Sequence, residues 1–413
     1  MRIALATVGT AGDVVPFATL ARALVERGHV VTAVTWPVHR DALSQHGVRV
    51  EVAGPHADPA RIEQVAADAA GRGPMEQVAL LRDFHLEDGV AHVRRLREVL
   101  PGHDVVVLHG IHALAQAAAL DAGLRWATAV FDPVLLPTAT AAPPGMPSLG
   151  PANRLAWWML DRALSRLARP LDDVLNRAGS AQRGLSLFQA RSPLLHMVAC
   201  SPSIITVPPD LPAGTVVTGR WFDRSVPDAL PEAVEAFLAD GAAPIIISFG
   251  SMRGIPAEEL RGAVDRLLRA GRRVIVQGPF EPQQASPGLL RVQAVDHRAL
   301  LPRAALAVHH GGAGTSHAVA AAGLPSVVVP HVGDQRYWAD RLHRLGVAPR
   351  PVSLEKLEAA ALAETVLAAA ADQALEQHAR ALATRLSAED GVGVSALLVE
   401  QSAGGGISEP RPS

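Results

Sequence analysis

A chain of 413 residues is long enough for two domains of ordinary size, each with its own core. A hydrophobic fraction of 49% and a charged fraction of 19% are typical of a globular protein. A net charge of −2 gives no indication of a basic surface that would bind nucleic acid or an anionic membrane. The single cysteine, Cys200, excludes an internal disulfide and a cysteine-built metal site, so we expect a reducing, cytoplasmic location. No stretch would span a bilayer and no signal-peptide pattern is visible, so we expect no integral membrane association.

The first half of the chain alternates short apolar runs with helical patterns, which is typical of a doubly wound parallel sheet. Strands are predicted at 2–8, 30–35, 48–53, 104–109 and 126–131, and helices at 16–27, 38–46, 59–100 and 113–122. Six prolines between 132 and 153 predict an irregular loop at the carboxyl-end rim of the sheet, where loops often contact ligands. Helical signals cover 154–178, and an apolar run at 195–200 closes this half.

The second half repeats the alternation after a proline-rich segment that reads as an interdomain connection around a short strand at 216–218. Its strands are predicted at 245–249, 273–277, 290–295 and 306–310. We therefore expect an α/β protein of two Rossmann-like domains whose parallel sheets face each other across a cleft. The expected boundaries are an N-terminal domain at 1–205, a linker at 206–228, a C-terminal domain at 229–390, a helix at 391–402 that could pack back on the first domain, and a disordered tail at 403–413.

The most informative stretch runs from 306 to 335 and reads as strand, glycine loop, helix and strand. Three glycines after the first strand let the backbone turn sharply and approach a ligand closely: Gly311, Gly312 and Gly314. A helix is predicted to start near Thr315. Its amino end would lie at the carboxyl end of the strand, where unpaired N–H groups and the helix dipole favour an anion, most obviously a phosphate.

Histidines and polar residues flank this glycine loop. His310 precedes it and could donate a hydrogen bond or a charge to a diphosphate, although a buried structural histidine is the alternative. The structural interpretation is preferred for His309, His317 and His331, because their spacing does not suggest metal ligation. A polar pair, Asp334 and Gln335, follows the next strand on the same rim.

Two further loops follow strands in the same way. The loop at 7–16 contains one acid, Asp13, which is either a helix cap or a base that removes a proton from a hydroxyl nucleophile, and both roles are compatible. His109 and His112 lie at a strand end that should border the same site, so one of them could assist Asp13 or touch an acceptor, with core or surface roles as the alternative. Gly250 and Ser251 follow the strand at 245–249 and could contact a phosphate, although any such turn can contain Gly-Ser.

Together these residues resemble an inverting glycosyltransferase of the two-Rossmann GT-B architecture. More narrowly, the chain is similar to bacterial glycosyltransferases that decorate antibiotics and sterols with sugars from nucleotide donors. The resemblance covers almost the whole length and rests on 9–13 with Pro16 and Gly28-His29, on 218–222, on 249–252, and on 309–315 through 334–335. The family usually has Arg at the position of Ala11 and Gln at that of Val15, which puts the function of that arginine in doubt here.

The resemblance assigns roles to individual residues. It implies that Asp13 is the general base with Thr10 nearby, while the acceptor-side role of His109 or His112 rests on their place at a strand end alone. His310 and the N–H groups near Gly314 would hold the donor diphosphate, while the backbone at 293–295 would meet the nucleobase. The full donor set is Gly250, Ser251, Val295, His310, Gly312, Ala313, Gly314, Thr315, Asp334 and Gln335, with the last two on sugar hydroxyls.

The implied reaction is a single in-line displacement that moves a sugar from a UDP- or dTDP-sugar to a hydroxyl of a small natural-product acceptor. No cofactor is implied, and no metal either, because a helix amino terminus plus His310 would stabilise the leaving group and the chain contains no Asp-x-Asp triplet. A monomer or homodimer is expected. Two alternatives remain: a non-hydrolysing nucleotide-sugar epimerase, and a nucleotide-binding auxiliary protein without activity of its own.

Overall fold

The structure is a computed structural model with two compact units. Unit 1 comprises Met1–Val65, Met75–Asp223 and Asp390–Ser413, and unit 2 comprises Ala66–Pro74 and Arg224–Glu389. The residues that the structure describes are 1–44, 47–69, 72–134, 136–143, 146, 149–186, 190–225, 227–250, 255–278, 286–293 and 295–404. Most of the tail expected at 403–413, and Ser251 of the expected site, therefore lie outside the described residues.

Unit 1 is built on a seven-stranded parallel sheet in the order β3-β2-β1-β4-β5-β6-β7. Its strands are β1 (Arg2–Ala6), β2 (Val30–Thr35), β3 (Arg49–Val52), β4 (Val105–His109), β5 (Trp126–Val130), β6 (His196–Val198) and β7 (Thr215–Val217). The last strand pairs with β6, so the sheet of unit 1 extends into the segment 206–228 that reads as a linker in the sequence.

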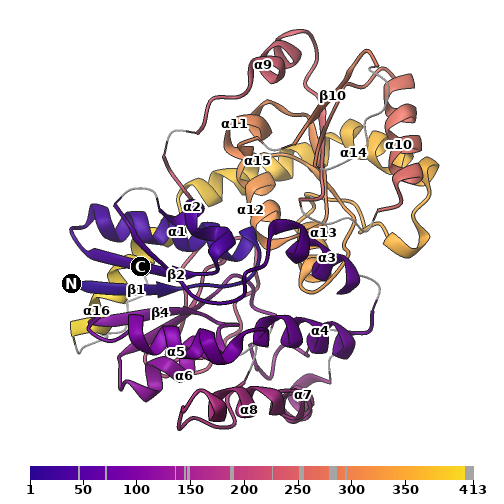
Figure 1. Ribbon diagram of the computed structural model, residues 1–413. Coiled ribbons are helices and arrows are strands. Elements are labelled where there is room, and N and C mark those ends of the chain that lie inside the picture. The colour runs from indigo at the N-terminus through magenta and orange to yellow at the C-terminus, as the bar shows by residue number, and fades with distance from the viewer. Residues whose placement is uncertain are drawn as a thin grey trace. The chain divides into compact units, whose positions relative to one another are not determined.

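Helices cover both faces of this sheet (Figure 1). Residues of α1 (Ala11–Glu26), α2 (Arg40–Leu43) and α16 (Gly391–Gly404) pack on one face, and residues of α5 (Gly89–Val99), α6 (Ala113–Asp121) and α8 (Arg169–Arg177) on the other. The other helices are α3 (Pro59–Ala69), whose last residues belong to unit 2, α4 (Pro74–Leu86) and α7 (Asn153–Leu167), with short 3-10 turns at Pro37–His39 and Gly150–Ala152. Alternate residues of β1 point to opposite faces: Ile3 packs with Phe17 of α1 and Val399 of α16, whereas Ala4 packs with Val93 of α5.

The start of one predicted helix of unit 1 was wrong. The helix predicted at 16–27 begins at Ala11, because Thr10 and Asp13 cap its first turn and Pro16 is accommodated inside the helix. The helical signals at 154–178 correspond to two helices, α7 and α8, separated at Ala168 where Pro170 begins a new first turn.

Unit 2 is built on a five-stranded parallel sheet in the order β10-β9-β8-β11-β12. Its strands are β8 (Ile245–Ser248), β9 (Val274–Gln277), β10 (Leu289–Val292), β11 (Leu306–His309) and β12 (Ser326–Val328). Its helices are α9 (Glu232–Ala239), α10 (Ala257–Arg269), α11 (His297–Leu300), α12 (Ala313–Ala321), α13 (Gln335–Arg344), α14 (Ala359–Ala371) and α15 (Gln373–Ser387), with 3-10 turns at Leu301–Arg303 and Leu354–Lys356. Helices α10 and α14 cover one face, and α9, α11 and α12 contribute to the core on the other.

The two sheets share a local plan at their centres. In unit 1, Ala6 of β1 is beside Leu108 of β4, and in unit 2, Ser248 of β8 is beside His309 of β11. Both β4 and β11 end in a histidine, and a helix of 9 residues starts at the fourth residue after it. The β1–β4 pair of unit 1 therefore corresponds to the β8–β11 pair of unit 2.

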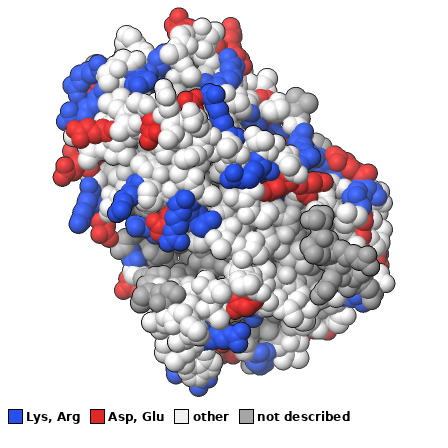
Figure 2. All heavy atoms as spheres, turned by 180° about the vertical axis from the view of Figure 1, so that it is seen from behind, with Lys and Arg blue, Asp and Glu red and all other residues white. Residues whose placement is uncertain are grey.

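Two surface properties accompany this architecture. On the face shown in Figure 2, acidic and basic side chains are interspersed rather than gathered by sign. Among the residues that the structure describes, every helix is too short or too polar to cross a bilayer.

Candidate active site

Asp13 is held at the amino end of α1 by Thr10. The backbone N–H of Thr10 donates to Oδ2 of Asp13 at 2.8 Å, and its hydroxyl donates to the same oxygen at 3.0 Å. Gly9 has a φ of +116°, and a Cβ there would lie 2.4 Å from Oδ2. Only glycine therefore lets the chain turn so close to this carboxylate.

His109, the last residue of β4, lies on the other side of the carboxylate. Its Nε2 is 3.4 Å from Oδ1 of Asp13, and its Nδ1 accepts the backbone N–H of Ile111 at 3.2 Å. Because Nδ1 is used as an acceptor, the proton of the neutral ring is on Nε2 and faces Asp13. Nδ1 of His109 is thus engaged by the backbone, whereas Nε2 is buried within ion-pair distance of Asp13 but without a hydrogen bond among the described residues.

The pKa of Asp13 reflects opposing effects. Burial raises the pKa, but His109 and the two Thr10 donors together lower it by more than burial raises it. The net pKa is therefore below the usual value of an aspartate. The side chain is 28% exposed. Asp13 is therefore ionised at neutral pH, and a ligand can reach it.

A second carboxyl group near this site was not predicted. Asp132 follows β5, the strand beside β4, and its Oδ1 accepts the backbone N–H of Val134 at 2.9 Å. Burial raises the pKa of Asp132, and the negative charge of Asp13 raises it further. The signal in the sequence is an acid directly after a buried strand. The prolines that follow it predict an irregular loop and do not indicate a role for the acid.

His112, the other histidine proposed to assist Asp13, packs elsewhere in unit 1. It is at the N-cap position of α6 and only 3% exposed, and its ring centroid is 5.2 Å from that of His92. Burial first, and then the neighbouring histidines, hold its pKa well below the usual value. The structure therefore brings His109, and not His112, beside the carboxylate of Asp13.

In unit 2, two histidines precede the glycine loop and α12. Nδ1 of His309 accepts the N–H of Gly311 at 3.1 Å, just as Nδ1 of His109 accepts that of Ile111. The next ring, His310, lies over the loop so closely that a Cβ at Gly312 would be 2.4 Å from its Nε2. Glycine at 312 makes room for the His310 ring at the amino end of α12.

This amino end presents backbone donors that have no partner inside the helix. The helix starts at Ala313, two residues before the predicted start, because Gly312 takes an extended N-cap conformation and its carbonyl accepts the N–H of Ser316 at 2.9 Å. The N–H groups of Ala313, Gly314 and Thr315 precede that first helical bond and have no partner inside the helix. Such groups, together with the helix dipole, favour an anion.

The histidines around this end of unit 2 are uncharged. Burial, followed by the neighbouring His331 and His297, lowers the pKa of His310 to about 4. Burial also lowers the pKa of His309 to about 3, with smaller effects from His310 and His297. At neutral pH His310 is therefore a hydrogen-bond donor or acceptor rather than a cation, and Nδ1 of its ring is buried without a partner in the described ranges.

The other donor-side candidates are tied to the fold. Asp334 is the N-cap residue of α13 and its Oδ2 accepts the indole N–H of Trp338 at 2.6 Å. Gln335 is 5% exposed, and its Oε1 accepts the N–H groups of His331 at 2.7 Å and Val332 at 3.1 Å. Because Oε1 faces these two N–H groups, the amide nitrogen of Gln335 faces away from them.

Gly250 and Val295 complete the candidates that the structure describes. Gly250 is exposed after β8, and a Cβ there would be 3.4 Å from Cε1 of His310, so this residue is next to the imidazole. Val295 is partly buried against the core near α11. The structure brings Gly250, His310 and the start of α12 together.

The topology of each unit and the strand-end loops define a class of protein, the GT-B glycosyltransferases. Solved structures support this fold. A structure described as the glycotransferase of kitacinnamycin matches with a TM-score of 0.73 and 20% identity, covering 97% of this chain and 98% of the other. The glycosyltransferase VinC in complex with dTDP matches with a TM-score of 0.69 and 18% identity, covering 98% and 100%.

Sequence relatives define the family within this class. The O-mycaminosyltylonolide 6-deoxyallosyltransferase of Streptomyces fradiae is 34% identical over 97% of both chains, and the vancomycin aglycone glucosyltransferase of Amycolatopsis orientalis is 30% identical over 100% of this chain and 99% of its own. Residues 261–392 match the family described as erythromycin biosynthesis protein CIII-like, C-terminal domain. The chain belongs to the bacterial GT-B glycosyltransferases of this macrolide and glycopeptide antibiotic type.

Proposed function

We propose that the protein is an inverting glycosyltransferase that moves a sugar from a UDP- or dTDP-sugar to a hydroxyl of a small natural-product acceptor, with Asp13 as the general base. One observation carries this proposal. The carboxylate of Asp13 is ionised and partly exposed, with Oδ2 fixed by Thr10 and Oδ1 facing His109. A hydroxyl nucleophile needs such a proton acceptor within hydrogen-bond reach.

Asp13 is a better candidate for the base than His109. Nδ1 of His109 accepts from Ile111 and its Nε2 proton faces Asp13, so the neutral ring has no free lone pair for an acceptor hydroxyl. We assign His109 as a positioning residue that orients the carboxylate. Its proton also stabilises the charged form of Asp13.

For the donor, we place the diphosphate at the amino end of α12. Three N–H groups without a partner inside the helix, at Ala313, Gly314 and Thr315, are suited to phosphate oxygens, and the ring of His310 lies next to this end of the helix. The structural relative VinC is described in complex with dTDP, which supports a nucleoside diphosphate as the ligand. Preorganised N–H dipoles stabilise charge as it develops on a leaving group, which is why we propose a transfer that does not need a divalent metal.

The proposed reaction is one displacement. The acceptor oxygen attacks the anomeric carbon and forms the new C–O bond, while its proton passes to Oδ1 or Oδ2 of Asp13. The bond from the anomeric carbon to the diphosphate oxygen breaks, and its electron pair leaves with the nucleoside diphosphate. Attack and departure on opposite sides invert the configuration at that carbon.

The test compares wild-type protein with Asp13→Asn. A panel of hydroxylated acceptors is incubated with dTDP- and UDP-sugars, and the anomeric configuration of each product is read by NMR. The amide cannot take the proton, so we expect transfer to fall by about 10²- to 10⁴-fold. Calorimetry with dTDP should give nearly unchanged affinity, because the substitution is in unit 1 and the proposed diphosphate site is in unit 2.

Each other outcome points to a different conclusion. Transfer at the wild-type rate by Asp13→Asn would exclude this residue as the base. Retained configuration in the product would exclude the single displacement. Epimerisation of a nucleotide sugar incubated without any acceptor would favour the epimerase, and nucleotide binding without turnover would favour the auxiliary protein.

A further inference from the structure

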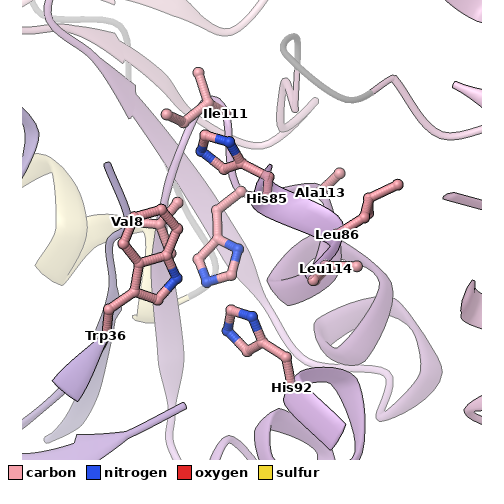
Figure 3. A pocket seen from close by; sticks show the side chains of 9 residues that line it. Val8, Trp36, His85, Leu86, His92, Ile111, Ala113 and Leu114 are labelled. Atoms are coloured by element: carbon pink, nitrogen blue, oxygen red, sulfur yellow. The ribbon is translucent and has the colours of Figure 1, made fainter. Parts of the chain in front are cut away.

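A small interior cavity of unit 1 has room for about one water molecule. Trp36, His85, His92 and His112 contribute to its lining, and it measures about 10 Å³ (Figure 3). Nε1 of Trp36 and both ring nitrogens of His92 have no hydrogen-bond partner among the residues that the structure describes. A buried water typically makes about three hydrogen bonds to such groups, so the cavity gives no reason to infer a larger ligand.

The surface of unit 1 gathers large apolar side chains around the start of α7. Twelve such side chains are exposed in the described part of the chain, and five of them lie between 146 and 159: Met146, Leu149, Leu155, Trp158 and Met159. A single exposed apolar side chain is ordinary, whereas a group of them with polar neighbours marks a site of interaction with a protein or a membrane. An interaction surface is therefore expected around the start of α7.

Helix α7 directs three of these side chains outward from one face. Leu155, Trp158 and Met159 are three and four residues apart, so they lie on the same side of the helix, and they are 58%, 61% and 45% exposed. The neighbouring Trp157 is buried, and its indole N–H donates to the carbonyl of Ala141 at 2.8 Å. Figure 1 shows α7 beside α8 at an outer edge of unit 1. One face of α7 thus packs on unit 1, and the other projects apolar groups into solvent.

Two arginines continue the outward face toward the end of α7. Arg162 and Arg166 follow Met159 at intervals of three and four residues, and both are exposed. Neither forms an ion pair with any other residue that the structure describes. We call Leu155, Trp158, Met159, Arg162 and Arg166 the α7 surface. Its first half is apolar and its second half is basic.

The α7 helix has a local excess of positive charge. It contains three arginines and one aspartate, so its net charge is 3 − 1 = +2. The net charge of the whole chain, −2, averages over this excess and conceals it. The α7 surface is therefore complementary to a partner that offers negative charge beside an apolar region.

This charge argues against a second copy of the chain as the partner. In a symmetric dimer the same surface of each copy enters the interface, so Arg162 and Arg166 would meet their own counterparts and repel. The apolar part is also small, on the order of 500 Å² even with the side chains at 146 and 149, whereas a stable protein interface buries about 800 Å² on each partner. Binding to a lipid surface has no such minimum, because apolar burial and electrostatic attraction add together.

We propose that the α7 surface binds the surface of an anionic phospholipid membrane. Leu155 and Trp158 enter the boundary between headgroups and acyl chains, which is where the apolar side chains of interfacial helices lie. Arg162 and Arg166 contact the lipid phosphates and keep their charged ends in the headgroup layer. Attachment by one helix face is peripheral and reversible. This inference does not depend on the proposed function.

The first test is co-sedimentation of the full chain with vesicles at low ionic strength. One set of vesicles is phosphatidylcholine alone, and the other is an equal mixture of phosphatidylcholine and phosphatidylglycerol. We expect binding to the anionic vesicles, at least about fivefold weaker binding to the neutral ones, and release from the anionic ones as salt is added. Absence of binding to the anionic vesicles overturns the proposal.

The second test assigns the binding to the α7 surface. Trp158→Ser should weaken binding to anionic vesicles by about tenfold, because the largest apolar group is lost. Arg162→Gln should weaken it by about fivefold and leave binding to neutral vesicles unchanged. The matched controls are Leu397→Ser on α16 and Arg272→Gln in unit 2, since both residues are exposed and are not part of the α7 surface. Thermal unfolding checks that all four variants are folded.

The remaining outcomes distinguish other partners. Equal losses in the control variants would show that the α7 surface is not the membrane contact. Light scattering that finds a dimer of the wild type and a monomer of Trp158→Ser would identify a second copy as the partner and overturn the proposal. Binding to the soluble polyanion heparin without binding to anionic vesicles would overturn it in favour of an acidic macromolecule. Vesicle binding is measured without any sugar donor, so its result and that of the transfer assay are independent.

Discussion

The corresponding strand ends of the two units have the same backbone plan but opposite chemistry. In unit 1, β4 ends in His109 and the loop after β1 contains Asp13, whose Oδ1 is 3.4 Å from the imidazole. In unit 2, β11 ends in His309, and Nε2 of this ring is buried without a hydrogen-bond partner in the described ranges. One strand end therefore places its imidazole beside a carboxylate, and the other buries its imidazole beside a second histidine, His310, which helps burial to lower its pKa.

The pairing register shows how closely the two loops correspond. Thr7 and Ser248 occupy equivalent places beside the two strand-end histidines, and Gly9 and Gly250 each follow two residues later with positive φ. A carboxylate in the first loop gives unit 1 a site that can take a proton. Uncharged donors at the second give unit 2 a site suited to an anion. The same scaffold can thus supply two halves of a transfer reaction by changing a few residues at strand ends.

The largest effect on the rate of transfer is expected from substituting Gly9 of unit 1, whose counterpart in unit 2 is Gly250. In Gly9→Ala, the new Cβ would be 2.4 Å from Oδ2 of Asp13, so the carboxylate must move. A displacement of about 1 Å can cost about 10²-fold in rate, and we expect the rate of sugar transfer to fall by that factor. A fixed-time transfer assay measures this fall. As a control, calorimetry with dTDP should give nearly wild-type affinity for the nucleotide.

Gly250→Ala is the matched control for that experiment. Gly250 has a φ of +58°, and its Cβ would be in van der Waals contact with His310 at 3.4 Å. A left-handed conformation costs an alanine about 1–2 kcal/mol, which affects stability without forcing a catalytic group to move. Because Gly250 is itself a donor-side candidate, the two variants are compared at saturating donor. A loss of transfer there in Gly250→Ala as large as that in Gly9→Ala would contradict the view that only the first glycine is fixed by a catalytic carboxylate.

A smaller effect is expected at the anion site of unit 2. The pKa of free His310 is about 4, because burial is reinforced by His331 and His297, and a bound diphosphate would raise it. At a pH between the pKa of free His310 and its higher pKa in the complex, His310 takes up a proton when the diphosphate binds. The affinity for dTDP should therefore rise as the pH falls from 7 toward 5. His310→Gln keeps a neutral donor but cannot take up the proton, and we expect it to weaken dTDP binding by about tenfold near pH 5.

Calorimetry in two buffers with different ionisation enthalpies counts the protons taken up. The terminal phosphate of dTDP titrates in the same range, but its contribution is common to wild-type protein and His310→Gln and cancels in the difference. Equal proton uptake by the two proteins would show that His310 stays neutral in the complex.

Much of the fold follows from local sequence. The strand Val30–Thr35 agrees residue for residue with its apolar run, and the helix predicted at 113–122 differs from α6 by one residue. The start of α1 was missed because it depends on hydrogen bonds between Thr10 and Asp13, which hydrophobic periodicity does not report, and because Pro16 reads as a first-turn residue. Boundaries set by side-chain capping are the part that a periodic pattern cannot give.

The candidate site, too, has parts that a local sequence pattern indicates and parts that it does not. Asp13 and His310 could be proposed as site residues from the sequence because each is in a loop directly after an apolar strand. The contact between His109 and Asp13 depends on β4 pairing with β1 across an insertion of two strands and several helices, and the unpaired rings of Trp36 and His92 come from separate elements. Long-range topology decides such contacts, and no local pattern contains it.

The smallest expected effect on rate, and the sharpest test of the comparison, is at the two strand-end histidines. In the proposed reaction transfer requires ionised Asp13, so we expect kcat/KM to fall on the acid side as this carboxyl is protonated. Burial raises the pKa of Asp13 and His109 is the main group that lowers it. In His109→Leu the effect of burial is less opposed, the pKa rises, and the acid limb of the pH profile moves to higher pH, with only a few-fold loss of kcat/KM near neutral pH.

His309→Leu separates this electrostatic effect from damage to the backbone. Each substitution removes the Nδ1 acceptor of one loop N–H, that of Ile111 or that of Gly311, so the structural cost is similar in the two variants. Only His109→Leu should move the acid limb, and an equal shift in both would contradict the pairing of His109 with Asp13. If His109 itself accepted the proton, His109→Leu would instead lower transfer by about 10²-fold or more at every pH. A shifted limb with a nearly intact plateau therefore identifies the carboxylate as the base and the imidazole as the group that positions it.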